Sequence, residues 1–207
     1  KTYSISFGAG CANELPFSSL LAAHCKTDHR VVELSPAAIL RYLDDSIGML
    51  SDPIGDPLTV PNALLFREAA ADVGVVLNGE GGDPCFGGPK NLPMLLAELY
   101  GGGVSGGEEG PGSRERSYLR AHLKCFDEFS TMLSPAVLHA LREMPLESRV
   151  APFFEDARWR TFVTKLQALN VIFKGGHHIL PKVDAVSAPF GVLARSFNAM
   201  SAHLGRQ

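Results

Sequence analysis

Short strand-like patterns alternate with helical ones over the first third of the chain. Residues 2–7 alternate polar and apolar side chains, as expected for a half-buried strand. The next segment, 16–26, places four residues at helical spacing: Phe17, Leu20, Leu21 and His24. Residues 29–34 and 74–77 read as two further strands, the second short and buried. The pattern therefore predicts strand, helix and strand, with a third strand after an intervening helical region.

That helical region carries its own start signals. Ser35 is a good N-cap, and Pro36 follows at the first helical position, where its missing N–H costs nothing. A proline-rich loop, 52–61, leads to a second helix through Leu64, Leu65 and Ala69. Strands separated by helices predict an α/β fold with a parallel sheet of at least three strands, right-handed crossovers and flanking helices.

The second half has a different character. Residues 100–113 are dominated by glycine, which predicts a flexible surface loop. From Ser117 onward the apolar spacing is helical, so we expect a helical layer. We predict an α/β part over 1–88, a flexible glycine-rich connection over 89–116 and a helical part over 117–207.

Composition and charge narrow the class of protein. The 207 residues are 45% hydrophobic and 20% charged, as in an ordinary globular domain. The net charge of −3 lacks the basic footprint of nucleic-acid binders. The four cysteines lie far apart, and no apolar run reaches the roughly 20 residues needed to cross a bilayer. We expect a cytoplasmic protein with no nucleic-acid or membrane partner.

The segment with most chemical information follows the third predicted strand. It contains two carboxylates in a glycine-rich turn: Asn78, Gly79, Glu80, Gly81, Gly82 and Asp83. Open parallel sheets bind ligands at this end of a strand, and glycine lets the backbone approach anionic oxygens. Two carboxylates beside such a cradle suit a phosphate ligand if magnesium bridges them. The alternative is a tight structural turn with two solvated acids.

Several ordered segments resemble asparagine synthetases and their relatives. The string from Val75 to Asp83, with Phe86-Gly87-Gly88 after it, is similar to the family segment V-L-S-G-E-G-G-D-E-L-F-G-G. Other segments follow in the family's order: residues 2–7, Asn13-Glu14, Thr27-Asp28-His29, Asp52-Pro53 with Asp56-Pro57, 174–184, and 191–196 against G-x-E-x-R-x-P-F-L-D. The resemblance implies the synthetase domain, an ATP pyrophosphatase with an adenine nucleotide alpha hydrolase-like fold.

This family adenylates a carboxylate such as aspartate with ATP, releases pyrophosphate, and lets ammonia or an amine displace AMP. The resemblance implies that Glu80 acts in forming the intermediate and that Asp83 holds Mg²⁺ on the pyrophosphate. Ile5, Asn78 and Gly79 would contact adenosine, with Gly81 and Gly82 in the same nucleotide-binding turn. Asn78 replaces the more usual Ser.

Departures from the family pattern lead to further expectations. The phosphate-binding S-G-G-x-D-S loop precedes the family's second strand, which residues 2–7 resemble, and Ser105-Gly106-Gly107 only mimics its first letters. Lys182 does not occupy the position of the family's catalytic lysine. Because Lys1 stands in place of an initiator Met, we expect a piece of a longer protein that binds ATP weakly and turns over little by itself.

Other functions remain open on the sequence. A catalytically silent nucleotide-binding relative is one alternative, and an amide-forming enzyme similar to β-lactam synthetases or peptide cyclases is another. A glutaminase domain upstream and a homodimer are the partners that the resemblance leaves open. His177 and His178 are adjacent and point about 100° apart on a helix, so we expect a helix-start or packing role and not a shared metal ion.

Overall fold

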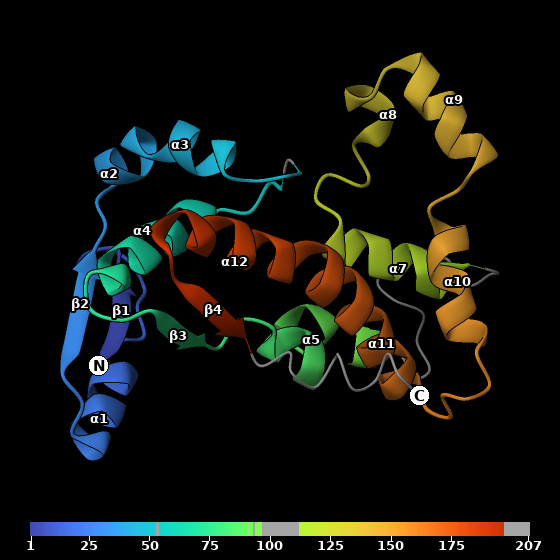
Figure 1. The fold of residues 1–207 in the computed structure, drawn as a ribbon. Helices are drawn as coiled ribbons and strands as arrows, with labels where there is room; N and C mark the ends of the chain where they lie inside the picture. The colour runs from blue at the N-terminus through green and yellow to red at the C-terminus, as the bar shows by residue number, and fades with distance from the viewer. Residues whose placement is uncertain (53, 93, 97–111, 197–207) are drawn as a thin grey trace. The chain divides into compact units, whose positions relative to one another are not determined.

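The computed structural model describes residues 1–52, 54–92, 94–96 and 112–196, which form two compact units (Figure 1). The first unit joins Lys1–Glu80 to the segment that begins at His178, and the second is Gly81–His177. The fold is mixed α/β with mostly helical structure and small parallel sheets, which confirms that part of the predicted class. Most of the predicted connection over 89–116 and the tail from Phe197 lie outside the described residues.

Two parallel strand pairs lie in the first unit. Its elements are β1 (Thr2–Ser6), α1 (Leu15–Cys25), β2 (His29–Glu33), α2 (Pro36–Arg41), α3 (Leu43–Gly48), α4 (Thr59–Ala70), β3 (Val75–Asn78), α12 (Leu180–Ser187), a 3₁₀ turn (Ala188–Phe190) and β4 (Leu193–Ser196). β1 pairs with β2 from Thr2↔His29 to Ser6↔Glu33, and β3 pairs with β4 from Val75↔Leu193 to Asn78↔Ser196.

Helix α4 packs against both strand pairs. Val60 and Leu64 on one side of it join Leu34 in a buried cluster against Ile5 and Val32. Ala63 and Phe66 join a second cluster with α12 and β4, whose other buried members are Ile179, Val183, Val186, Val192 and Ala194. The apolar spacing of α4 thus serves two core regions of one unit.

The prediction of a single sheet with three or more strands is wrong in its pairing. Among the described residues, β1 pairs with β2 and β3 pairs with β4, in two separate sheets. Alternation of strands and helices predicts parallel orientation but does not determine which strands are neighbours. The partner of β3 comes from more than a hundred residues later, in a segment whose sequence pattern did not indicate a strand.

The second unit is helical, and helices continue through α12 until β4, as the helical spacing after Ser117 predicts. Its elements are α5 (Gly82–Phe86), a 3₁₀ turn (Pro89–Asn91), α7 (Ser113–His122), α8 (Phe129–Met132), α9 (Pro135–Glu143), α10 (Glu147–Glu155) and α11 (Phe162–Asn170), followed by a π-helical stretch (Val171–Ile179) that extends into the first unit. Its core is built from Met94, Tyr118, Leu119, Val150, Phe154, Leu166 and Leu169. None of the described helices is both long and apolar enough to cross a membrane.

Candidate functional site

The loop after β3 begins with a side-chain turn. The backbone N–H of Glu80 donates to Asn78 Oδ1 over 2.9 Å, which tightens the chain directly after the strand. A β-carbon added to Gly79 would meet nothing within 4 Å, so the backbone between these residues is open on that side. The predicted glycine-rich turn therefore begins at the carboxyl end of a parallel strand.

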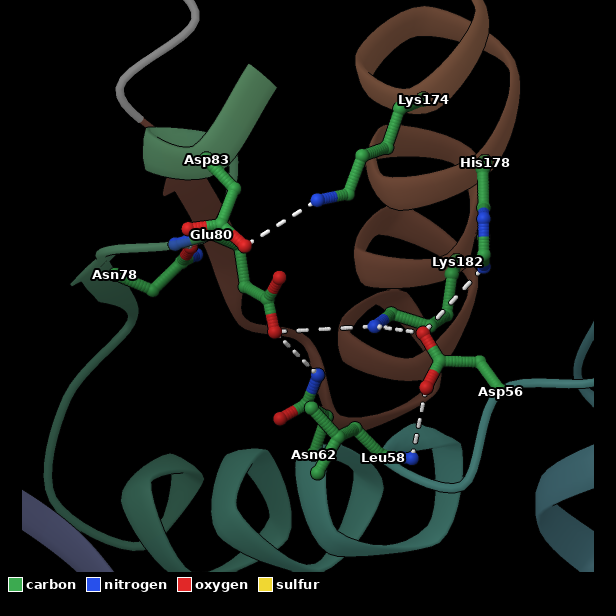
Figure 2. A network of polar contacts seen from close by, with 9 residues as sticks. All are labelled: Asp56, Leu58, Asn62, Asn78, Glu80, Asp83, Lys174, His178 and Lys182. Carbon is green, nitrogen blue, oxygen red and sulfur yellow. Dashed lines mark hydrogen bonds and ion pairs between the residues drawn. The ribbon is translucent and has the colours of Figure 1, made fainter. Parts of the chain in front are cut away.

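Glu80 belongs to a polar cluster within the first unit, which we call the Glu80 cluster: Asp56, Asn62, Glu80, His178 and Lys182 (Figure 2). Asn62 on α4 donates through Nδ2 to Glu80 Oε1 over 3.1 Å. Lys182 Nζ on α12 lies 3.8 Å from the same oxygen. The Glu80 carboxylate is therefore held from two helices.

Lys182 is the most buried member of the cluster. Its side chain is 1% exposed, and its Nζ donates to Asp56 Oδ2 over 2.8 Å. A buried ammonium loses its hydration, and only close opposite charge and hydrogen bonds compensate for that loss. The two carboxylates of the cluster supply this compensation.

Asp56 is fixed by the start of α4. Its Oδ1 accepts a hydrogen bond from the N–H of Leu58 over 2.9 Å, and its carbonyl accepts one from Thr59 over 3.1 Å. Asp56 and Pro57 therefore form a hydrogen-bonded turn just before α4, which leaves Oδ2 to face Lys182 and His178. The cluster is anchored to backbone at this point.

The pKa of the Asp56 carboxyl lies well below its ordinary value of 3.8. The contact with the His178 imidazole is the largest cause, burial opposes it, and Lys182 and the Leu58 N–H lower the pKa further. His178 Nε2 lies 3.4 Å from Asp56 Oδ2, against 2.8 Å for Lys182, so Lys182 makes the tighter contact. Asp56 is an anion throughout the physiological pH range.

A depressed pKa in the folded state makes Asp56 a source of acid sensitivity. The contribution of Asp56 to the free energy of unfolding is complete at pH values above 3.8, the ordinary pKa of the carboxyl group. It is lost as the pH falls through the lower pKa of the folded state. We expect the difference in free energy of unfolding between wild type and Asp56→Asn to shrink between about pH 5 and pH 2. Urea titrations at a series of pH values measure this difference, and a gap that stays constant over the range would contradict the assignment.

A second polar cluster lies in the second unit around Asp83. Gly81 precedes α5 with a φ of 95°, a left-handed conformation that favours glycine. Lys174 Nζ donates to Asp83 Oδ2 over 3.2 Å (Figure 2). The N–H groups of Gly87 and Gly88 donate to the Asp83 carbonyl over 2.9 and 3.1 Å, which folds the chain back over this residue. The Asp83 side chain is 57% exposed and accessible to a ligand.

Gly88 is required by the position of the Asp83 side chain. A β-carbon at residue 88 would lie 2.5 Å from Asp83 Cγ, closer than real contacts allow. We expect Gly88→Ala to displace the carboxylate from Lys174 and to lower the free energy of unfolding by about 1–3 kcal/mol. Gly82→Ala is the stability control, because its β-carbon would meet nothing within 4 Å. Equal unfolding free energies for the two variants would show that the contact is unimportant.

The structure places the predicted site residues in three locations. Asn78, Gly79 and Glu80 lie together at the end of β3, while Gly81, Gly82 and Asp83 open the second unit. Ile5 lies in β1, which does not pair with β3, and packs against the cluster around Leu34. The nucleotide contacts assigned to these residues stay predictions.

The sequence pattern indicated no supporting role for Asn62, for Lys174 or Asp56, which lie in segments that resemble the family, or for Lys182, which was considered only as the catalytic lysine. One signal for Lys182 was available. It lies three residues after Ile179 and four before Val186, so it falls on the apolar stripe of its helix. A lysine in such a stripe is almost never fully buried unless it is paired. That position indicated an acidic partner but could not identify which one.

The donor set for a metal ion is sparse. Among the residues that the structure describes, no group of three or more His, Cys, Asp or Glu side chains could hold an ion. Magnesium commonly binds through one or two carboxylates together with substrate phosphates. A single accessible carboxylate such as Asp83 fits that mode of binding and does not fit an all-protein metal site.

Two curated proteins align with part of this chain. The chain is 31% identical over 88 residues to asparagine synthetase [glutamine-hydrolyzing] 1 of Bacillus subtilis, an alignment that covers 42% of this chain and 14% of that protein. It is also 31% identical over 87 residues to a putative asparagine synthetase [glutamine-hydrolyzing] of Mycobacterium bovis, with 42% and 13% covered.

The aligned part is thus about one seventh of these relatives' length. No solved structure matches the chain. The sequence model of the asparagine synthase family, however, matches residues 1–195. That match includes both polar clusters, and the chain belongs to the asparagine synthase family.

Proposed function

We propose that the protein carrying this chain is an ATP-dependent ligase that adenylates a carboxylate, aspartate in the first instance, and converts it to an amide. Membership of the asparagine synthase family supports this class of reaction. Among the geometric observations, one carries most weight: Glu80 stands at the carboxyl end of a parallel strand, and its carboxylate is held by Asn62 and Lys182. Such strand ends are where open α/β sheets bind their ligands.

The proposed reaction has two steps. A carboxylate oxygen of the substrate attacks the α-phosphorus of ATP, and the bond to the bridging oxygen breaks with release of pyrophosphate. Ammonia or an amine then attacks the carbonyl carbon of the acyl-adenylate, loses a proton and displaces AMP. The first step supplies the good leaving group that a free carboxylate lacks.

Glu80 is the residue that we assign to the first step. Its backbone N–H is fixed by Asn78 and its side chain by Asn62, so it enters the reaction with little freedom left to lose. Asn78 and Gly79 would contact the adenosine through backbone groups, together with Ile5 on β1. Gly81 and Gly82 would leave room for phosphate oxygens, because they carry no β-carbon.

Asp83 would hold Mg²⁺ on the pyrophosphate side. The ion would neutralise charge on the phosphate oxygens. Without the ion, Lys174 already supplies a positive charge 3.2 Å from Asp83 Oδ2. Asp83 and Lys174 would therefore exchange partners when the phosphates bind, with the lysine ammonium released toward anionic oxygens.

We expect Asp83→Asn to raise the magnesium concentration needed for activity and to be partly rescued at high magnesium. A neutral amide oxygen still binds a hard cation, only less strongly than a carboxylate does. Pyrophosphate-exchange rates measured against magnesium concentration check this expectation. A variant with the wild-type magnesium dependence would remove Asp83 from the metal site.

Carboxylate-dependent exchange of labelled pyrophosphate into ATP tests the proposed function itself. The protein should be expressed at its full encoded length and offered aspartate, other amino acids, and larger carboxylates. Exchange that requires one carboxylate supports the ligase. Exchange only with a larger carboxylate would favour a relative of the β-lactam synthetases.

One observation favours the catalytically silent alternative. Leu193 on β4 stands where the family pattern G-x-E-x-R has its glutamate, and its side chain is 53% exposed. A silent relative would bind a nucleotide without exchanging pyrophosphate for any carboxylate. Calorimetry with ATP, run beside the exchange assay, separates that outcome from an active ligase.

A further inference from the structure

We propose that Lys182 is a positioning residue that fixes the rotamer of Glu80, with Asp56 as its anchor. The inference rests on the proposed function, because that function gives Glu80 a role in adenylation for which its side chain must be positioned. Lys182 itself would contact neither substrate nor phosphate. It would act through the glutamate.

The contacts made by Glu80 are one-sided. Among the described residues, both the Asn62 hydrogen bond of 3.1 Å and the Lys182 ion pair of 3.8 Å fall on Oε1. Two partners from two different helices restrict rotation of the carboxylate more than either would alone. In the proposed reaction, Oε2 would then be the oxygen that faces the reacting group.

Lys182 can hold this position because it is itself fixed. Its side chain is 1% exposed, so water cannot take over its hydrogen bonds. Its Nζ is tied to Asp56, and Asp56 is tied to the backbone N–H of Leu58 at the start of α4. A continuous chain of contacts therefore runs from the turn before α4 to the Glu80 carboxylate.

Charge also requires the lysine. Without the Lys182 ammonium between them, the carboxylates of Asp56 and Glu80 would repel each other. This repulsion would turn the more exposed carboxylate outward. Glu80 is the more exposed of the two, with 25% of its side chain accessible against 14% for Asp56. Removing the ammonium should thus move Glu80 and leave Asp56 in its turn.

The alternative is that Lys182 only compensates the buried charge of Asp56. A double variant separates the two roles. Asp56→Asn with Lys182→Met removes the buried ion pair and leaves the partly exposed Glu80 carboxylate as the one remaining charge of the three, so most of the fold stability should recover. Glu80 would still lack its second partner. The compensation role predicts recovery of both fold and rate, whereas the positioning role predicts recovery of the fold alone.

The test compares Lys182→Met, the double variant and wild type in the full-length protein. We expect both variants to lower kcat for pyrophosphate exchange by about 10- to 100-fold, with the KM for ATP changed less than about threefold. The unfolding midpoint should drop in the single variant and largely return in the double one. Lys165→Met, which breaks a lysine contact to the Phe154 carbonyl in the other unit, is the control for general destabilisation. A double variant with wild-type kcat would overturn the proposal.

A second readout does not depend on activity. In a crystal structure of Lys182→Met, which keeps the Asp56 charge, we expect the Glu80 carboxylate to leave its contact with Asn62 and adopt another rotamer. An unchanged Glu80 side chain would overturn the positioning role. If the wild-type protein exchanges no pyrophosphate with any carboxylate, the proposed function fails, and the crystal structure alone decides the positioning role.

Discussion

Glu80→Gln is expected to lower the rate of carboxylate-dependent pyrophosphate exchange by about 100- to 1,000-fold, while the protein stays folded. The amide keeps the size of the side chain and can still accept a hydrogen bond from Asn62 through its oxygen. What it loses is the negative charge held beside Lys182 and any interaction made only in the transition state. Removal of one such preorganised group has an effect of about this size.

The kinetic signature should be a lower kcat with little change in the KM for ATP, because ground-state binding does not depend on the lost charge. Glu68→Gln is the matched control. Glu68 lies on the same helix as Asn62, has a 51% exposed side chain and makes a long contact of 3.9 Å to Arg30. If Glu80→Gln exchanged pyrophosphate as fast as Glu68→Gln, the loop after β3 would be a structural turn.

Lys182→Met is expected to lower the free energy of unfolding by about 3–5 kcal/mol, the usual effect of removing one partner from a buried ion pair. Methionine fits the aliphatic stem but leaves Asp56 without its 2.8 Å contact. The Leu58 N–H and His178 still reach Asp56, and they limit the loss. Urea unfolding at pH 7 measures the change.

Lys26→Met serves as the control, because Lys26 is exposed at the end of α1. Loss of a lysine charge at the surface should change the free energy of unfolding by at most about 0.5 kcal/mol. A loss below about 1 kcal/mol for Lys182→Met would show that water enters the cluster and solvates Asp56. The buried ion pair would then not be a feature of the folded protein in solution.

Local sequence signals predicted where the helices and strands of this fold lie better than they predicted which elements pack together. Ser35 and Pro36 start α2 where expected, and Ser35 Oγ accepts a hydrogen bond from the N–H of Ala38. The expected single helix after them is two short ones, because the chain turns at Tyr42 between α2 and α3. Apolar spacing in a sequence gives the period of a helix but does not show a break of one residue.

Burial was harder to predict than helical structure. Phe17, Leu20 and Leu21 have the expected helical spacing on α1, yet they are 75%, 71% and 64% exposed. An apolar stripe predicts that a helix has a side to bury, but whether that side is covered depends on other segments. The pairing of β3 could not be predicted for the same reason, because its partner strand is distant in the sequence.

The sequence indicated the loop residues of the candidate site but not the residues that hold the loop side chains in place. Asn78, Glu80 and Asp83 were identifiable, because glycines and carboxylates after a strand are a local signal. Asn62 and Lys182 approach Glu80 from helices 18 and 102 positions away in sequence. Only the folded chain brings such residues together, so no pattern within the loop could indicate them.

The central claim is that this chain belongs to an enzyme that activates a carboxylate by adenylation. The most direct test is exchange of ³²P-labelled pyrophosphate into ATP by the full-length protein, with and without aspartate. We expect exchange that depends on a carboxylate and on magnesium and that falls about 100-fold or more in Glu80→Gln. A folded protein that binds ATP and shows no exchange with any carboxylate, or one that releases ADP and phosphate instead, would contradict it.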